Sequence, residues 1–226
     1  MSVTTHERPG VYSEYDASSV VQGRQGRKMV GMAAIHATAP AGVPQTVTSY
    51  EGALIAFGST GGQDMTELIR LALKNGATGV VAVPVADEEG YEAAFAALAA
   101  MDDIGVVICD SVDREVQQSL RDSAAAASAA RRERIAVAAG GAGETVTELL
   151  ERAKALNSER VVLVAPGGTD EEGKAVSGLS LAAAVAGAIA GTTDPALPLG
   201  ARCSADCMGW RQPMGTTTWT CSSGAA

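Results

Sequence analysis

The chain has 226 residues, enough for one domain or two small ones and for a substantial buried core. Its 17 basic and 26 acidic residues give a formal net charge of −9 and a pI near 4.7. This balance argues against a nucleic acid or an anionic membrane as partner, because both require a basic surface. Aromatic residues make up only 4% of the chain, so the core must be built from aliphatic side chains.

Residues 201–226 differ from the rest in composition. They contain only three charged residues but hold both tryptophans and three of the four cysteines, namely Trp210, Trp219, Cys203, Cys207 and Cys221. The cysteine spacing is loose for zinc and no histidine is near, so we expect no metal site there. The fourth cysteine, Cys109, ends an apolar run and is typical of a buried thiol in a reducing compartment. No apolar signal segment begins the chain, and we expect a protein made without export.

Residues 1–27 show no helical period and predict an extended arm. After the arm, apolar runs typical of strands alternate with helical segments. The predicted strands are Lys28–His36, Val43–Val47, Gly79–Val85, Ile104–Cys109, Arg134–Ala139 and Arg160–Ala165. The predicted helices are one from an N-cap at Thr48 to Gly58, one from Asp64 to Asn75, and then Tyr91–Met101, Val112–Arg132, Val146–Leu156 and Leu179–Ala190.

Three of these helix starts carry capping-box spacing, at Thr48–Glu51, Asp64–Glu67 and Thr145–Glu148. Continuous apolar strands separated by helices are the pattern of a parallel sheet covered on both faces. We therefore predict an α/β fold over residues 28–200, doubly wound, with a mostly parallel sheet and helices on both faces. An extended N-terminal arm precedes it, and an irregular tail over residues 201–226 follows.

No constellation in the sequence supports catalysis. Ser111 follows a predicted strand, but the two histidines are His6 in the arm and His36 at another strand end, so no base is near it in sequence. We expect Ser111 to be the N-cap of the next helix. The cluster Arg131–Arg134 is expected to complement the dipole of the helix that it ends, and it needs no ligand.

Gly140–Glu144 lies between a predicted strand and a predicted helix, which is the right place for a dinucleotide loop. Its glycine spacing differs from G-x-G-x-x-G, so a tight turn is the preferred interpretation. Two alternatives stay open: a domain that binds a small molecule or nucleotide at Gly140–Glu144, and a hydrolase that uses Ser111. We expect no catalytic residue, no cofactor and no bound metal.

Several segments taken in order resemble the tail sheath proteins of contractile bacteriophages. They are His6–Tyr15 (HERPGVYSEY), the alanine-rich helix that runs into Ala129–Arg134, Arg160–Pro166 (RVVLVAP), and Ala184–Gly187 with Asp194–Ala196. No single segment is diagnostic, but their order and spacing over about residues 6–200 are specific. The resemblance implies a structural subunit whose subtilisin-like α/β domain keeps its fold without a working triad.

The resemblance also implies a function. Such subunits polymerise around a tail tube, and contraction drives the tube through the host envelope. The expected partners are copies of the chain itself, the tail tube protein, and baseplate and tail terminator proteins, in a virion assembled in the bacterial cytoplasm. The arm is expected to add a strand to a sheet of a neighbouring subunit, through Arg8, Pro9, Val11, Tyr12 and Tyr15.

The sequence departs from the family after about Arg202. Sheath proteins of this type continue into a further domain, whereas this chain has 31 residues after Pro195. Read in a shifted frame, Arg202–Ala226 back-translates to an amphipathic helix, an acidic turn and a second helix similar to the family's continuation. We therefore expect a truncated or frameshifted C-terminus with impaired polymerisation. Sequencing the gene across the Gly200 codon tests this.

Overall fold

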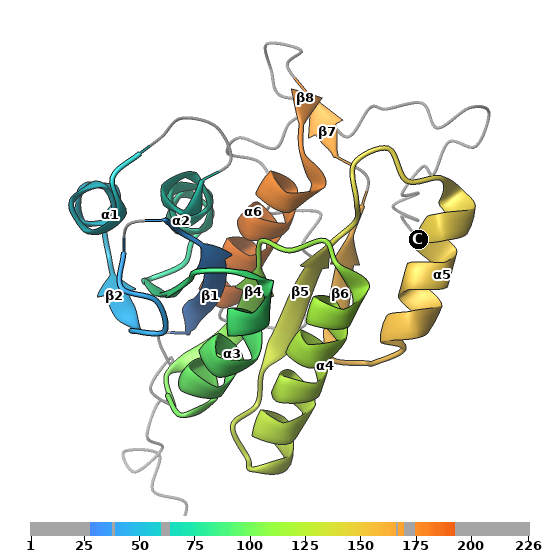
Figure 1. The fold of residues 1–226 in the computed structure, drawn as a ribbon, viewed down its shortest axis with the longest axis horizontal. Helices are drawn as coiled ribbons and strands as arrows, with labels where there is room; N and C mark the ends of the chain where they lie inside the picture. The colour runs from blue at the N-terminus through green and yellow to red at the C-terminus, as the bar shows by residue number, and fades with distance from the viewer. Residues whose placement is uncertain (1–27, 38, 60–63, 166, 170–174, 193–226) are drawn as a thin grey trace, which may run out of the picture.

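The computed structural model describes residues 28–37, 39–59, 64–165, 167–169 and 175–192. The predicted arm and the tail with its cysteines and tryptophans lie outside these residues. Six strands form one sheet in the order β2-β3-β1-β4-β5-β6 (Figure 1). They are β1 Met29–Ile35, β2 Gln45–Val47, β3 Val80–Val85, β4 Ile104–Cys109, β5 Ile135–Ala139 and β6 Val161–Val164. A short hairpin, β7 Gly168–Thr169 and β8 Ala175–Val176, was not predicted.

Five of the six strands run parallel, and only β2 is antiparallel, on the outer side of β3. The helices are α1 Tyr50–Phe57, α2 Met65–Lys74, α3 Tyr91–Ala99, α4 Arg114–Ala129, α5 Val146–Leu156 and α6 Gly178–Gly191, with a 3-10 turn, η2, at Glu88–Gly90. α2 and α6 pack on one face of the sheet, and α3 and α4 pack on the other. The predicted doubly wound, mostly parallel α/β fold is therefore confirmed.

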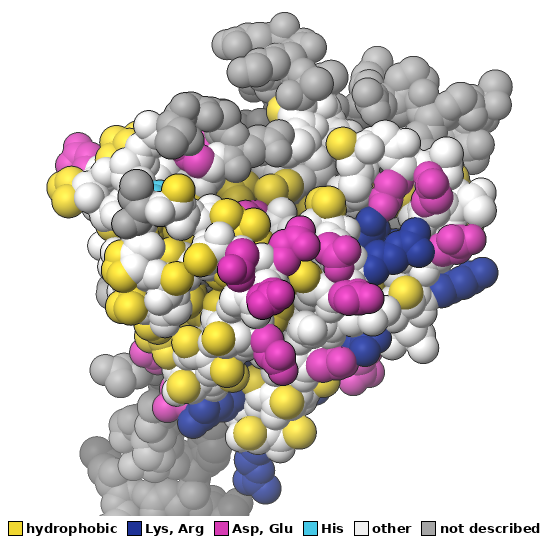
Figure 2. Space-filling view, in the orientation of Figure 1, with side chains coloured by type: hydrophobic (Ala, Val, Ile, Leu, Met, Phe, Trp, Pro, Cys, Tyr) yellow, Lys and Arg dark blue, Asp and Glu magenta, His cyan; other side chains and the backbone are white. Residues whose placement is uncertain are grey.

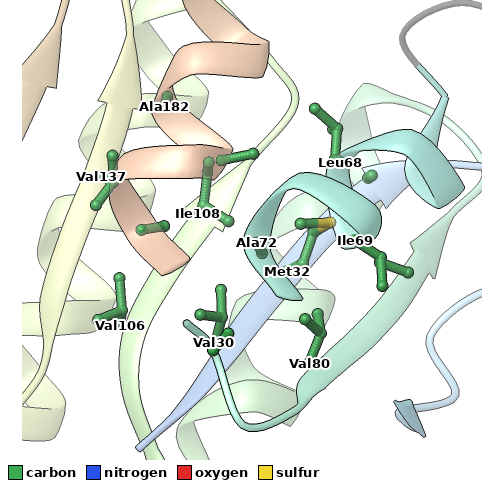
Figure 3. Packing of buried hydrophobic residues seen from close by; sticks show 14 of the residues in the cluster. Val30, Met32, Leu68, Ile69, Ala72, Val80, Val106, Ile108, Val137 and Ala182 are labelled. Atoms are coloured by element: carbon green, nitrogen blue, oxygen red, sulfur yellow. The ribbon is translucent and has the colours of Figure 1, made fainter. Parts of the chain in front are cut away.

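Each face of the sheet carries its own aliphatic core. The larger core lies under α2 and α6, and Figure 3 shows its centre, with Val30, Met32, Leu68, Ile69, Ala72, Val80, Val106, Ile108, Val137 and Ala182. The second core lies under α3 and α4, where the predicted apolar face of α3 is buried: Tyr91, Ala94, Phe95 and Leu98. Alternation along β1 explains the two cores, since Met32 faces one and Ala33 the other.

α6 is apolar on every side because it lies between the sheet and α2. A Cβ atom on Gly187 would lie 2.2 Å from the carbonyl oxygen of Ala72. Only glycine allows this approach of the two helix backbones. The alanine-rich sequence of α6 is thus the result of tight helix packing.

Most predicted boundaries agree with the structure within two residues, but two N-caps are wrong, that of α1 and that of α4, which is described with the site below. Ser49, not Thr48, caps α1, and its side chain accepts a hydrogen bond from the backbone of Gly52 at 3.1 Å. The predicted caps at Asp64 and Thr145 are confirmed, the second as a full capping box with Glu148. Gly58 ends α1 as predicted, with φ of +69°.

The arginine cluster after α4 acts on a different helix from the one predicted. Arg134 is buried, and its guanidinium donates to the carbonyl oxygens of Leu98 and Met101 at the C-terminal end of α3. Arg132 donates to Ala99 at the same helix end. These cations therefore complement the dipole of α3 and tie it to β5.

Candidate functional site

The carboxyl ends of β1 and β4 meet where the strand order reverses. From β1 the chain goes outward to β3 and then returns to β4 on the other side of β1. In open α/β sheets this reversal point is where ligands commonly bind. Asp110, directly after β4, lies here, and its backbone N–H donates to Ala33 in β1.

The Asp110 carboxylate, which lies at this reversal point, is already bonded to other groups of the chain. It accepts hydrogen bonds from the backbone N–H of Ile35 at 2.9 Å and from the hydroxyl of Tyr91. Burial raises the pKa of Asp110, and burial together with the Asp110 charge raises the pKa of Tyr91. Burial also raises the pKa of the neighbouring Cys109 thiol to about 12, so this cysteine stays protonated and unreactive.

The loop Gly140–Glu144 connects β5 to α5 and so lies at the same end of the sheet, where the parallel strands have their carboxyl ends. Its carboxylate folds back over the glycines: Glu144 accepts a hydrogen bond from the backbone N–H of Gly141 at 3.0 Å. The same carboxylate forms an ion pair with Arg152 of α5. The hydrogen bond from Arg152 lowers the pKa of Glu144, so the group is ionised at neutral pH.

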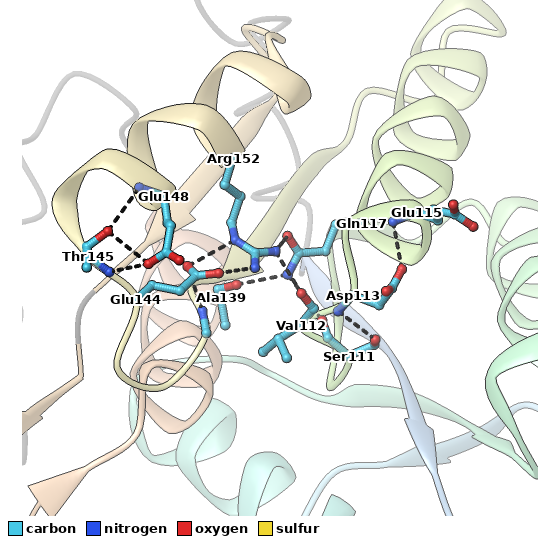
Figure 4. A network of polar contacts seen from close by, with 11 residues as sticks. Ser111, Val112, Asp113, Glu115, Gln117, Ala139, Glu144, Thr145, Glu148 and Arg152 are labelled. Carbon is cyan, nitrogen blue, oxygen red and sulfur yellow. Dashed lines mark hydrogen bonds and ion pairs between the residues drawn. The ribbon is translucent and has the colours of Figure 1, made fainter.

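Arg152 is the centre of a buried polar network (Figure 4). Its side chain is 5% exposed, and one guanidinium nitrogen donates to the carbonyl oxygen of Val112 at 2.7 Å and to Gln117 at 2.9 Å. Gln117 in turn donates to the carbonyl oxygen of Ala139 at 2.8 Å. The network therefore fastens the loop before α4, the end of β5 and the loop before α5 to one another.

These contacts do not favour nucleotide binding at Gly140–Glu144. A phosphate there needs free backbone N–H groups and a positive surrounding. The N–H of Gly141 already has an anionic partner in Glu144, and Arg152 is neutralised by the same carboxylate. The loop is therefore a structural turn, as the glycine spacing predicted.

Ser111 is not the N-cap of α4, which corrects the sequence prediction. Asp113 caps this helix, and its carboxylate accepts from the backbone N–H groups of Glu115 at 2.7 Å and Val116 at 3.3 Å. The hydroxyl of Ser111 accepts from the N–H of Asp113 at 3.1 Å. Ser111 and Asp113, two residues apart, are both possible cap acceptors, and the carboxylate is the better one.

His36 is not arranged as a base for Ser111. Its Nε2 donates to the carbonyl oxygen of Phe57 at 2.8 Å, and its Nδ1 accepts from the backbone N–H of Ala39 at 3.0 Å. Both ring nitrogens are therefore engaged by backbone groups of the chain. The other histidine, His6, lies outside the described residues. Among the described residues, the geometry therefore gives the hydrolase alternative no support.

Within the described part of the chain, no group of three or more His, Cys, Asp or Glu side chains could hold a metal ion. No helix in that part is long and apolar enough to span a membrane. The predicted arm residues Arg8, Pro9, Val11, Tyr12 and Tyr15 lie outside it. Sequence reasoning missed the Arg152 network, because its partners are far apart along the chain.

Comparison with solved structures finds the same fold in tail sheath proteins. The sheath tail protein of Desulfitobacterium hafniense matches with a TM-score of 0.58 at 13% identity, over 81% of this chain and 62% of its own. The helical sheath of the anti-feeding prophage in its contracted state matches with a TM-score of 0.52 at 20% identity, over 81% of this chain and 52% of its own. The sheath tail protein of Listeria innocua matches with a TM-score of 0.55 at 11% identity, over 73% of this chain and 57% of its own.

The chain has the fold of the tail sheath proteins, and the resemblance seen in the sequence is confirmed at that level. No protein-family model matches the chain. No curated protein matches it either. The chain spans between half and two thirds of the length of these sheath proteins.

Proposed function

We propose that the chain is a structural subunit of the contractile tail sheath of a phage or prophage. The observation that carries the proposal is the shared fold with sheath proteins over about four fifths of the chain, 81% for the Desulfitobacterium protein. A structural role also agrees with a sheet edge filled by internal contacts at Asp110, Glu144 and Arg152. The α/β domain would be of the subtilisin-like type that the resemblance implies, without a working triad.

In this role, copies of the chain polymerise around a tail tube, and contraction drives the tube through the host envelope. The free energy for contraction lies in contacts between subunits that are stronger in the contracted arrangement, so no nucleotide is consumed. The tail tube, baseplate and terminator proteins are the other partners. The protein would belong to the virion and assemble in the bacterial cytoplasm.

We further propose that residues 1–27 link neighbouring subunits, with Val11, Tyr12 and Tyr15 as anchors of an added strand beside Arg8 and Pro9. Support comes from where the described domain begins and ends. The carbonyl oxygen of Lys28 accepts a hydrogen bond from Thr78, and Gly191 packs against Gly76. Lys28 and Gly191, next to the two ends of the described domain, thus both contact the short loop between α2 and β3.

Immunogold labelling of contractile particles tests the proposed function. An antibody against this chain should label particles from the producing bacterium along the whole length of the tail. Particles from a strain that lacks the gene should be unlabelled and have no sheath. Unlabelled tails from cells that make the chain would contradict the proposal.

A further inference from the structure

Large apolar side chains are exposed at the two opposite ends of the sheet. At the β2 end, Val43, Tyr50 and Ile55 are exposed, and Ile55 keeps 87% of its surface accessible; we name these three residues the α1 patch. At the β6 end, Val146 and Leu150 are 54% and 56% exposed; we name these two the α5 stripe. Figure 1 shows α1 and α5 on opposite sides of the domain, next to the two edge strands.

Two of the three residues of the α1 patch, Tyr50 and Ile55, belong to α1, a helix that is apolar almost all round. Ala53 and Phe57 are buried against the domain, yet Ile55 lies on the outer side. A helix with apolar residues on every side is normally covered on every side. Residues 35–58 contain a single charged side chain, Glu51. Figure 2 shows the apolar side chains gathered at this end of the molecule, over β2 and α1.

The α5 stripe runs along the outer flank of its helix. Val146 and Leu150 are four residues apart and so lie on one side of α5. Arg152 reaches toward α4, where it bonds Gln117, and helical geometry places the stripe more than about 100° away from that direction. The neighbouring strand β6 is half-buried at Val161–Leu163 and pairs only with β5 among the described strands. The described residues therefore leave this end of the sheet incompletely covered as well.

We propose that the α1 patch of one copy docks on the α5 stripe of the next copy, so that copies join head to tail. The proposal rests on the proposed sheath function and names the surfaces that would form one of its contacts. Surfaces at opposite ends of a subunit generate rings or open rows, as a sheath requires, whereas a self-complementary surface generates only a closed pair.

Charge also favours a second copy of this chain as the occupant. Two copies that each carry a net charge of −9 repel each other, so their contact needs surfaces with few charges, and the α1 patch is such a surface. The flanking charges are complementary: Glu51 lies four residues before Ile55, and Lys154 lies four residues after Leu150. Glu148 lies on a different side of α5 from the stripe, and Thr145 holds it in the capping box.

Sedimentation of the full chain tests the proposal with Ile55→Asp and Leu150→Asp. The wild-type chain should associate as its concentration rises, and each variant alone should associate at least about tenfold more weakly. An equimolar mixture of the two variants should form dimers, because each supplies the surface that the other lacks. Ala93→Asp, which adds the same charge at an exposed site on α3, should associate like the wild type. Circular dichroism checks that all three variants are folded.

The same sedimentation experiment distinguishes other binding partners of the α1 patch from the α5 stripe of a second copy. If Leu150→Asp associates normally while Ile55→Asp does not, the contact is a symmetric pair of α1 patches, and the proposal is wrong. A wild-type chain that stays monomeric at all concentrations also overturns it and leaves these surfaces to a different protein. Gold-labelled tails together with a monomeric chain would reject this contact but keep the proposed function.

Discussion

Arginine is a residue type usually found on the surface, yet the Arg152 side chain is buried. Acceptors from the loop before α4, from Gln117 and from Glu144 enclose its guanidinium. A buried ion pair of this kind contributes little compared with an apolar replacement, but breaking it leaves an unpaired buried charge. The pair therefore helps to determine how the loops at the carboxyl ends of the strands are arranged. Because Glu144 titrates, the pH dependence of stability can measure the contribution of the pair.

Glu144→Gln should destabilise the protein in a pH-dependent way. The pKa of Glu144 is lowered in the folded state, so its contribution is present above the unfolded pKa of about 4.3 and is lost as pH falls through the folded value. At pH 7 we expect a loss of about 2 kcal/mol, as for a hydrogen-bonded charged group.

Urea unfolding followed by circular dichroism between neutral and acidic pH measures this effect. The difference between wild type and variant should shrink as pH falls below about 4. Glu151→Gln, an exposed position on the same helix, is the matched control and should change the free energy of unfolding little. A difference that stays constant down to acidic pH would show that the Glu144 charge has no role in stability.

At the scale of elements, the start of α4 offers a direct test of which side chain caps it. Asp113→Ala removes the acceptor of two backbone N–H groups and should cost about 1 kcal/mol, typical of an N-cap. Ser111→Ala removes one acceptor outside the helix and should cost less than about 0.5 kcal/mol. Thermal or urea unfolding of both variants gives the comparison. The opposite order would restore Ser111 as the cap.

The strands and helices could be predicted because their signals are local. β4 and α5 have the predicted bounds, since a buried parallel strand is a continuous apolar run and a capping box marks a helix start. The direction of β2 could not be predicted, because alternation carries no information on which way a strand runs. The cap of α1 was misplaced by one residue because Thr48 and Ser49 are both suitable acceptors.

The polar network around Arg152 could not be predicted from local sequence patterns. Arg152, Gln117 and Glu144 come from different elements, and nothing in the sequence near any of them shows that they meet. The Gly140–Glu144 loop shows the same limit: its position suggested a ligand, whereas only the folded chain shows that Glu144 already occupies the N–H of Gly141.

For the molecule as a whole, charge and apolar surface act in opposite directions on self-association. A net charge of −9 makes copies repel on average over their orientations, and this repulsion extends over a Debye length. The attraction proposed between the α1 patch and the α5 stripe is apolar and short-ranged, so salt does not screen it. The balance between the two therefore depends on ionic strength.

Raising the salt concentration should strengthen association of the wild-type chain. Between about 0.01 M and 1 M salt the Debye length falls from about 30 Å to about 3 Å, which removes most of the repulsion between copies. Sedimentation at a fixed protein concentration should then show a larger average mass at high salt, and Ile55→Asp should show a much smaller increase. A contact held mainly by ion pairs would respond in the reverse direction, with a smaller average mass at high salt, because screening weakens pairs such as Glu51 with Lys154. The sign of the salt effect thus separates an apolar contact from an ionic one.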